Sequence, residues 1–216
     1  MTSPQLAGAA VPALLAAIAW SAVLLQLWLS VQLGFSNGKS LIGGLVVFFG
    51  YFTVLTNILI ALVGTAGASG KNAKTLHWLY RPSMVGCATT AILVVGIAYH
   101  FLLRKIWSPQ GAQLLADLLL HYVVPAGALL HWLVYRYSAR LPGWAPLTWC
   151  LYPLMYLVYV LARGEFLGSY PYPFIDVAAL GYPRVLVNTA GLMVAFLGLG
   201  FAVLGMARLV ASRHAL

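Results

Sequence analysis

Six long apolar stretches dominate the sequence and decide what the chain can fold into. They cover about residues 11–33, 41–64, 83–103, 113–135, 145–162 and 185–207, and charged residues, Gly or Pro bound each of them. Each stretch is near the ~20 residues that a helix needs to cross ~30 Å of hydrocarbon. We therefore predict an all-α, polytopic membrane protein with six transmembrane helices, which form a single domain over residues 1–216.

The composition excludes the common soluble classes. Hydrophobic residues make up 62% of the chain and charged residues 7%, whereas a soluble domain is about half apolar and a quarter charged. A net charge of +9 would suggest nucleic-acid binding in a soluble protein. Here the basic residues lie between apolar stretches, where membrane orientation and contacts with anionic lipids explain them. We predict membrane lipids as partners and no nucleic acid.

The basic residues in the short links predict the orientation, because cytosolic loops are enriched in Lys and Arg. Seven of them fall on the side of the two termini: Lys71, Lys74, Arg81, Arg136, Arg140, Arg208 and Arg213. Five fall on the opposite side: Lys39, Arg104, Lys105, Arg163 and Arg184. We expect both termini in the cytosol and the long 163–184 link, with Glu165 and Asp176, on the far side.

The fourth predicted span carries an ionisable pair, and such groups are costly inside a membrane. Asp117 and His121 are four residues apart and share a helix face, so the carboxylate can accept a hydrogen bond from the imidazole and fix its tautomer. Pro125 lacks the N–H that would pair with the carbonyl of His121, which predicts a kink there. The pattern fits a polar cavity, and it equally fits a histidine packed against a neighbouring helix.

The second predicted span is polar on the face that holds Thr53 and Asn57. Such residues often bond their own helix or hold helices together. Thr53 lies about 12 residues, or ~18 Å, into its span, and His121 about 8 residues, or ~12 Å, into its own. The two side chains are thus expected at comparable depth from the far side. If their helices touch, a hydroxyl and an imidazole form a nucleophile–base pair.

The histidines and cysteines do not have the spacing of a metal site. His121 and His131 are ten residues apart, which on a helix means ~15 Å of rise and about 80° of rotation. The chain has no His-x3-His or His-Glu-x-x-His pattern. We predict no metal and no cofactor, with a metal or haem site built from several helices as an alternative. Cys87 and Cys150 are expected to be small buried apolar residues.

Three short segments together resemble the androgen-induced / androgen-dependent family of multi-pass membrane hydrolases, which has animal and bacterial members. They are YFTVLTN (51–57), HYVVP (121–125) and YPFID (172–176). The six-span layout, the length and the order of the motifs also match. In that family a membrane-embedded threonine is the nucleophile and a histidine is its base, and these residues match Thr53 and His121. The resemblance implies a hydrolase of lipid esters, such as fatty acid esters of hydroxy fatty acids, in a bacterial cell membrane.

The resemblance also implies supporting roles. Asp117 would orient His121, although the animal proteins carry Asn and an extra His in that turn. An oxyanion donor is needed as well, and Asn57, Tyr51 and Tyr172 are the candidates. The 170–174 segment, YPYPF, is expected to cap the cavity. The alternative function is a non-catalytic membrane binding protein or small-solute transporter that uses the same polar residues, although the sequence has no helix-sized internal repeat.

Overall fold

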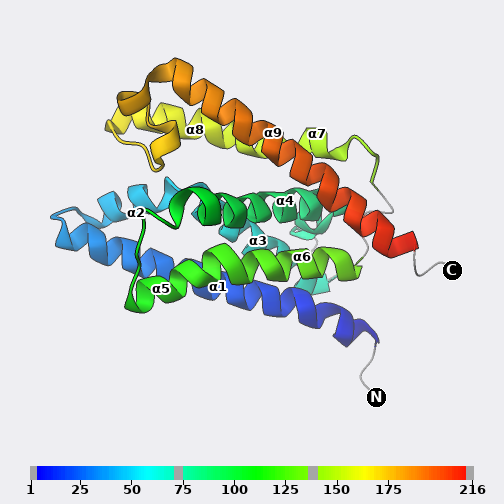
Figure 1. The fold of residues 1–216 in the computed structure, drawn as a ribbon. Coiled ribbons are helices and arrows are strands. Elements are labelled where there is room, and N and C mark those ends of the chain that lie inside the picture. Colours follow the sequence, from blue (N-terminus) through cyan, green and yellow to red (C-terminus); the bar gives the residue numbers. More distant parts are fainter. Residues whose placement is uncertain (1–3, 71–74, 136–140, 213–216) are drawn as a thin grey trace.

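The computed structural model describes residues 4–70, 75–135 and 141–212. In this part of the chain every regular element is helical (Figure 1). Six helices are long and apolar enough to cross a membrane: Ala9–Ser36, Phe52–Ser69, Pro82–Leu103, Gly111–Val134, Ala145–Leu167 and Val177–Leu209. The predicted all-α fold with six spans is therefore confirmed. Five of the basic residues used to predict the orientation, Lys71, Lys74, Arg136, Arg140 and Arg213, lie outside the described residues.

Three of the six spans contain more than one helical element. The elements in chain order are α1 (Pro4–Ser36), α2 (Leu41–Phe49), α3 (Phe52–Ser69), the 3-10 turn η2 (His77–Tyr80), α4 (Pro82–Ala98), η3 (Tyr99–Leu103), α5 (Gly111–Leu118), η4 (Leu119–Val123), α6 (Val124–Tyr135), α7 (Ala145–Trp149), α8 (Leu151–Leu167), the 3-10 turn η6 (Pro173–Ile175) and α9 (Val177–Ser212). The segments η3 and η4 are π-helical, with backbone hydrogen bonds from residue i+5 to residue i.

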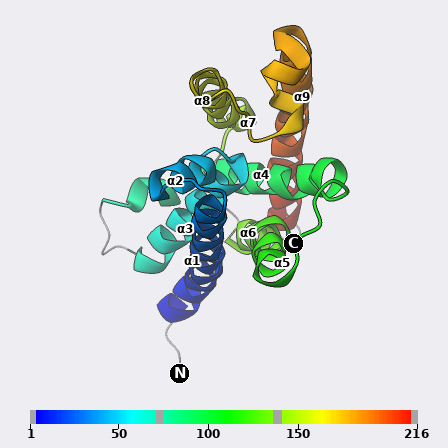
Figure 2. The same cartoon turned by 90° about the vertical axis from the view of Figure 1, so that its left-hand side faces the viewer.

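The helix α4 lies in the middle of the molecule, with α1, α3 and α6 on one side of it and α8 and α9 on the other (Figures 1 and 2). The core between these layers is built from buried apolar residues of α1, α3, α4, α6 and α9, including Leu15, Ile60, Ile92, Trp132 and Val203. Trp132 Nε1 donates to the carbonyl of Val203 at 3.0 Å, which joins α6 to α9.

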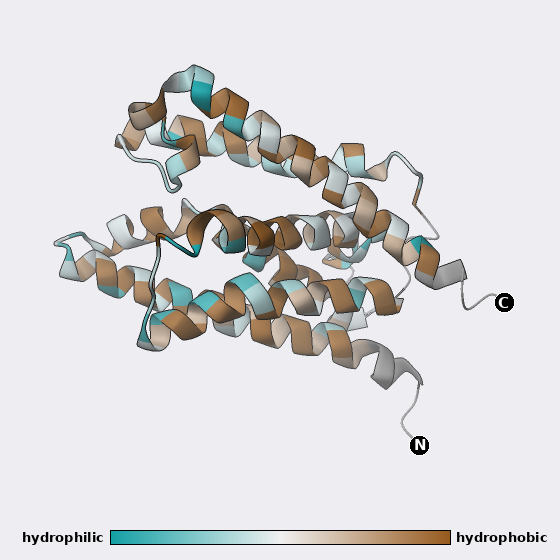
Figure 3. Ribbon diagram, in the orientation of Figure 1, coloured by the Kyte–Doolittle hydropathy of each residue, from teal (hydrophilic) through white to brown (hydrophobic). Residues whose placement is uncertain are grey.

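The two ends of the bundle are formed by different parts of the chain. The beginning of α1 and the end of α9 lie at one end, whereas the links 37–40, 104–110 and 168–172 lie at the other (Figure 1). Among the described residues, apolar positions predominate along the long helices, and hydrophilic positions occur near the end that holds these links (Figure 3). Small residues allow close helix contact, as membrane helices require. A Cβ on Gly64 of α3 would lie 2.8 Å from the Pro12 carbonyl oxygen of α1.

The predicted span 41–64 is not one helix, and this is a correction to the sequence analysis. Ser40 begins α2, because its Oγ accepts from the N–H of Gly43 at 3.2 Å. The chain then leaves the helical path at Tyr51, whose φ of −89° and ψ of 129° are extended. A new helix, α3, begins at Phe52. Thr53 therefore lies in the first turn of α3 and not about 12 residues inside a continuous helix.

Side chains of α8 satisfy the carbonyl groups that this break leaves without helical partners. Arg163 Nη2 donates to Val46 at 3.1 Å, Tyr159 Oη to Phe49 at 3.1 Å, and Tyr156 Oη to Gly50 at 3.0 Å. An unpaired backbone carbonyl inside a membrane costs several kcal/mol. The break is tolerated because a distant helix supplies the three donors.

Candidate functional site

A polar cavity of about 340 Å³ brings most of the predicted site residues together. Its walls include Thr53 from α3, Asp117 from α5, His121 from η4 and Tyr172 from the link before α9. Tyr51, at the break between α2 and α3, also lines it. Residues far apart in the sequence and on separate helices thus share one cavity.

The imidazole of His121 is oriented by Asp117. Nδ1 lies 2.9 Å from the backbone carbonyl oxygen of Asp117 and 3.3 Å from its carboxylate oxygen Oδ1. Both oxygens accept hydrogen bonds, so Nδ1 must carry the proton. In the neutral ring, Nε2 therefore holds the lone pair that a general base needs. The His121 side chain is 12% exposed and that of Asp117 is 5% exposed.

Tyr99 forms the other support of His121, and the sequence analysis missed it. The two rings are stacked, with centroids 3.9 Å apart and planes 18° apart. Tyr99 begins the π-helical segment η3, and His121 lies in the π-helical segment η4. Such π-bulges are frequent at functional sites. The sequence feature that could have identified Tyr99 is its position as an aromatic residue next to His100, at the end of the third span.

The π-helical segment η4 and Pro125 together leave the carbonyl of Leu120 without a backbone partner. In the i+5 pattern of η4, the partner of the Leu120 carbonyl would be residue 125, and proline has no N–H. Asn57 Nδ2 donates to this carbonyl at 3.3 Å and to the carbonyl of Thr53 at 2.8 Å. The Leu120 carbonyl, one residue before the His121 carbonyl considered in the sequence analysis, thus receives its donor from another helix.

The position of Asn57 corrects its expected role. It is fully buried, it does not line the polar cavity, and its amide group joins α3 to η4. Asn57 is thus a bridge between the two helices that carry Thr53 and His121. It is not placed to donate to an oxyanion in the cavity.

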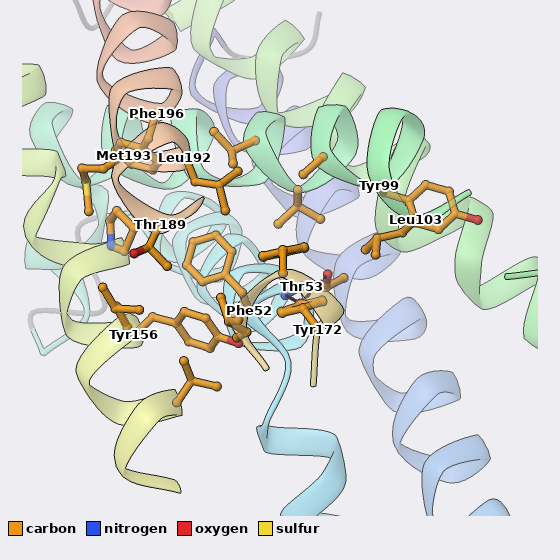
Figure 4. Close-up of a pocket in the computed structure, with 18 residues that line it drawn as sticks. Phe52, Thr53, Tyr99, Leu103, Tyr156, Tyr172, Thr189, Leu192, Met193 and Phe196 are labelled. Carbon is orange, nitrogen blue, oxygen red and sulfur yellow. Dashed lines mark hydrogen bonds between the residues drawn. The ribbon is translucent and has the colours of Figure 1, made fainter. Parts of the chain in front are cut away.

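Thr53 is held by Tyr172. Its hydroxyl Oγ1 lies 3.3 Å from Tyr172 Oη, and its backbone N–H donates to the same phenol oxygen at 3.3 Å. Figure 4 shows the two residues side by side. Among the described residues, no hydrogen bond joins the side chains of Thr53 and His121, which share only the lining of one cavity.

Tyr172 is a neutral hydrogen-bond donor. Burial raises the pKa of its phenol to about 12, an effect that the hydrogen bonds from Thr53 reduce but do not cancel. Its ring is stacked on Phe174 at 5.1 Å and meets Tyr51 edge-on at 5.6 Å. Because the phenol oxygen accepts the Thr53 N–H, its own proton is left for the Thr53 hydroxyl or for a ligand.

A second cavity, of about 110 Å³, lies on the other side of Thr53. Side chains of α4, α8 and α9 surround it, and Thr53, Tyr99, Leu103 and Tyr172 line both cavities (Figure 4). Thr53 therefore lies in the wall between a polar space and an apolar one. The sequence analysis missed the apolar cavity, because its walls come from four separate spans.

The outer part of the polar cavity carries hydrogen-bonding side chains. Gln113 Nε2 donates to Gln26 Oε1 at 2.9 Å, and Gln26 Nε2 donates to Ser30 Oγ at 3.2 Å. Lys39 and Asn37 also line this region. Water and a polar group can therefore be accommodated on the His121 side of Thr53.

Other titratable residues have structural contacts. His131 is 1% exposed, and its Nε2 lies 3.1 Å from Tyr80 Oη, so it joins α6 to η2. Asp176 Oδ1 accepts from the N–H of Ala179 at 3.1 Å, which caps the first turn of α9. Cys87 is buried, as expected, and Cys150 is half-buried. Within the described ranges, no three His, Cys, Asp or Glu side chains lie close enough to hold a metal ion.

Comparison with known proteins adds no identification, since no family model, no curated protein and no solved structure matches the chain.

Proposed function

We propose that this protein is an intramembrane hydrolase of lipid esters, with Thr53 as the nucleophile and His121 as the general base. The observation that carries the proposal is the shared polar cavity. It brings together a half-buried hydroxyl and an imidazole whose Nδ1 is already bound by Asp117. The resemblance of the 51–57, 121–125 and 172–176 segments to membrane threonine hydrolases supports the same assignment and gives the substrate class.

The reaction would proceed in two steps. Thr53 Oγ attacks the ester carbonyl carbon while Nε2 of His121 takes the hydroxyl proton. The ester C–O bond then breaks, and the protonated imidazole gives its proton to the departing alcohol. In the second step His121 takes a proton from water, whose oxygen attacks the acyl carbon of the acyl-threonine. The bond between that carbon and Thr53 Oγ then breaks, the imidazolium returns its proton to Thr53 Oγ, and the fatty acid is released. Assistance by a general base contributes ~10²–10⁴ to such a rate.

The proton of Thr53 would reach His121 across one bound water molecule, or directly after a small closure of the cavity that brings the two side chains together. General bases act directly or across a single water, and their hydrogen bonds often shorten only when substrate is bound. The polar cavity has room for that water, and its lining includes the hydrogen-bonded side chains of Gln113 and Gln26.

The best-placed oxyanion donor is Tyr172. Its O–H is the side-chain donor closest to Thr53 Oγ1, and its high pKa keeps the proton in place. Loss of one oxyanion donor typically costs ~10²–10³ in rate. Tyr51 lines the same wall against Tyr172 and has a supporting place in the proposal. We also propose the bacterial cell membrane as the location, with both termini in the cytosol.

Covalent labelling tests the proposal. The purified protein in detergent or nanodiscs is treated with an alkyl fluorophosphonate, and the labelled residue is identified by mass spectrometry. We expect label on Thr53, no label in Thr53→Ala, and a loss of labelling rate of about 10²–10⁴ in His121→Ala. Hydrolysis of a lipid ester by the same samples should fall in parallel.

Two matched variants control for general damage. Thr148→Ala removes an exposed threonine hydroxyl of α7 that bonds the Ala145 carbonyl. His100→Ala removes an exposed histidine at the end of the third span that contacts Tyr122. Both should label like the wild type. Equal labelling of all five proteins, or none of any, would refute the nucleophile assignment, and saturable uptake of a small solute would then favour a binding or transport protein.

A further inference from the structure

Resting on the proposed hydrolase function, we infer that the apolar cavity beside Thr53 holds the acyl chain of the substrate and that the alcohol part lies in the polar cavity. This assigns the two sides of the scissile ester to two separate spaces. It also predicts which helices decide the accepted chain length.

The position of Thr53 carries the first step of the argument. Its side chain belongs to the walls of both cavities, so an ester carbonyl held at Oγ1 has one cavity on each side. The bond that breaks in hydrolysis separates the acyl carbon from the alcohol oxygen, and the general base must reach that oxygen. His121 lines the polar cavity and not the apolar one. The alcohol therefore belongs on the His121 side, and the acyl chain on the other.

The chemistry of the apolar cavity fits a hydrocarbon. Its far wall is made by Leu192, Met193 and Phe196 of α9, as Figure 4 shows. The hydroxyl groups in the remaining wall are occupied elsewhere. Tyr156 Oη donates to the Gly50 carbonyl, and Thr189 Oγ1 donates to the Val185 carbonyl of its own helix. The hydroxyl of Tyr99, a third lining residue of this kind, points away from the cavity (Figure 4). Within the described lining, the hydroxyl pair of Thr53 and Tyr172 is therefore the polar end of the cavity.

The size of the cavity sets the expected chain length. One water-sized group needs about 10–15 Å³ of such space, so 110 Å³ corresponds to about seven to eleven of them. A methylene group is close to this size. We therefore expect acyl chains of about eight carbons to fill the cavity, and longer ones to need an exit toward lipid between α8 and α9.

A homologous probe series measures this directly. Labelling rates are compared for butyl, hexyl, octyl, decyl and dodecyl fluorophosphonates on the wild-type protein. Thr189→Phe should fill the cavity and move the optimum to shorter chains, and Met193→Ala should move it to longer ones. One methylene too many in a closed pocket costs on the order of tenfold or more. The matched control is Val194→Phe, because Val194 is 72% exposed on the same helix and does not line the cavity.

Opposite shifts in the two variants, with no shift in the control, would support the inference. General damage would lower all rates together without moving the optimum. An optimum that stays the same in Thr189→Phe and Met193→Ala would overturn the inference even if Thr53 is labelled.

A binding measurement separates this inference from the proposed function. Radiolabelled octanoic acid is added to Thr53→Ala, which has no nucleophile, and to Thr53→Ala with Thr189→Phe. Saturable binding that the second substitution weakens by about tenfold or more would support an acyl site, whether or not the wild type is a hydrolase. Equal binding by the two proteins, or no binding by either, would exclude the acyl site while leaving the labelling of Thr53 as a separate result.

Discussion

At the scale of single residues, the site depends on contacts that use backbone atoms as well as side chains. Nδ1 of His121 is bound by the Asp117 carboxylate and, at a shorter distance, by the Asp117 carbonyl oxygen. Any substitution at position 117 keeps that carbonyl. The tautomer of His121 is thus protected against loss of the carboxylate, and only the charge beside the ring is lost.

Asp117→Asn should therefore reduce hydrolysis much less than His121→Ala. We expect a loss of about tenfold for the first variant, and of about 10²–10⁴ for the second, which removes the base itself. The measurement is the rate of ester hydrolysis under single-turnover conditions. A loss in Asp117→Asn as large as that in His121→Ala would mean that the carboxylate, and not the carbonyl, fixes the ring.

Tyr172→Phe tests the neutral phenol. It should lower the labelling rate of Thr53 by about 10²–10³, because it removes one donor. The pKa of Tyr172 is raised to about 12, so its phenol stays protonated at pH values well below 12. The ratio of wild-type to variant rates should therefore stay constant up to that range. An ordinary phenol, with a pKa of ~10, would make the ratio fall about two pH units earlier, and such a fall would contradict the proposed role.

At the scale of elements, two irregular segments build the site. The break between α2 and α3 places Thr53 in the first turn of a helix, and η4 places His121 where the ladder of backbone hydrogen bonds changes register. The helix α4 packs closely against η4. A Cβ on Gly96 would lie 2.8 Å from the carbonyl oxygen of His121.

Gly96→Ala should destabilise the protein and disturb the site. We expect a cost of about 1–3 kcal/mol from overpacking, together with slower labelling of Thr53. The measurements are the midpoint of thermal unfolding in detergent and the labelling rate. Gly198→Ala in α9 is the matched control, since a Cβ there meets nothing within 4 Å. Equal effects of the two substitutions would show that the contact at Gly96 does not position His121.

The spans themselves were predictable, but the irregular segments were not. The length and hydrophobicity of the apolar stretches are local properties of the sequence, and they predict six spans. The spacing of four residues is also local, and it predicts that Asp117 and His121 share one helix face. The break at Tyr51 lies inside a continuous apolar run, FFGYFT (48–53), whose glycine is the only local sign of it. The donors that stabilise it are Tyr156, Tyr159 and Arg163, which are more than 100 residues away. The register shift at Leu120 likewise depends on Asn57 in another span.

At the scale of the whole molecule, the polar cavity extends to Asn37 and Lys39, at the end of the bundle opposite to the beginning of α1 and the end of α9. Lys39 belongs to its walls, whereas Arg81 precedes α4 at the other end. The proposed orientation puts Lys39 outside the cell and Arg81 in the cytosol. Both side chains are exposed.

Cysteine labelling in intact cells checks this orientation. In a background in which Cys87 and Cys150 are replaced by Ala, Lys39→Cys should react with a membrane-impermeant maleimide added outside. Arg81→Cys should react only after the membrane is permeabilised. The reverse pattern would place the cavity on the cytosolic side and would overturn the proposed topology while leaving the chemistry of the site unchanged.

The early position of Thr53 in α3 has a consequence for lipid sidedness. Between Thr53 and Ser69 the helix rises about 24 Å, which is most of a hydrocarbon layer of ~30 Å, and Ser69 ends α3 at the end of the bundle where α1 begins. The proposed nucleophile would thus lie nearer to one leaflet than to the other. Hydrolysis there would be asymmetric: substrates would be drawn from one leaflet, and the released fatty acid would return to that leaflet without crossing the bilayer.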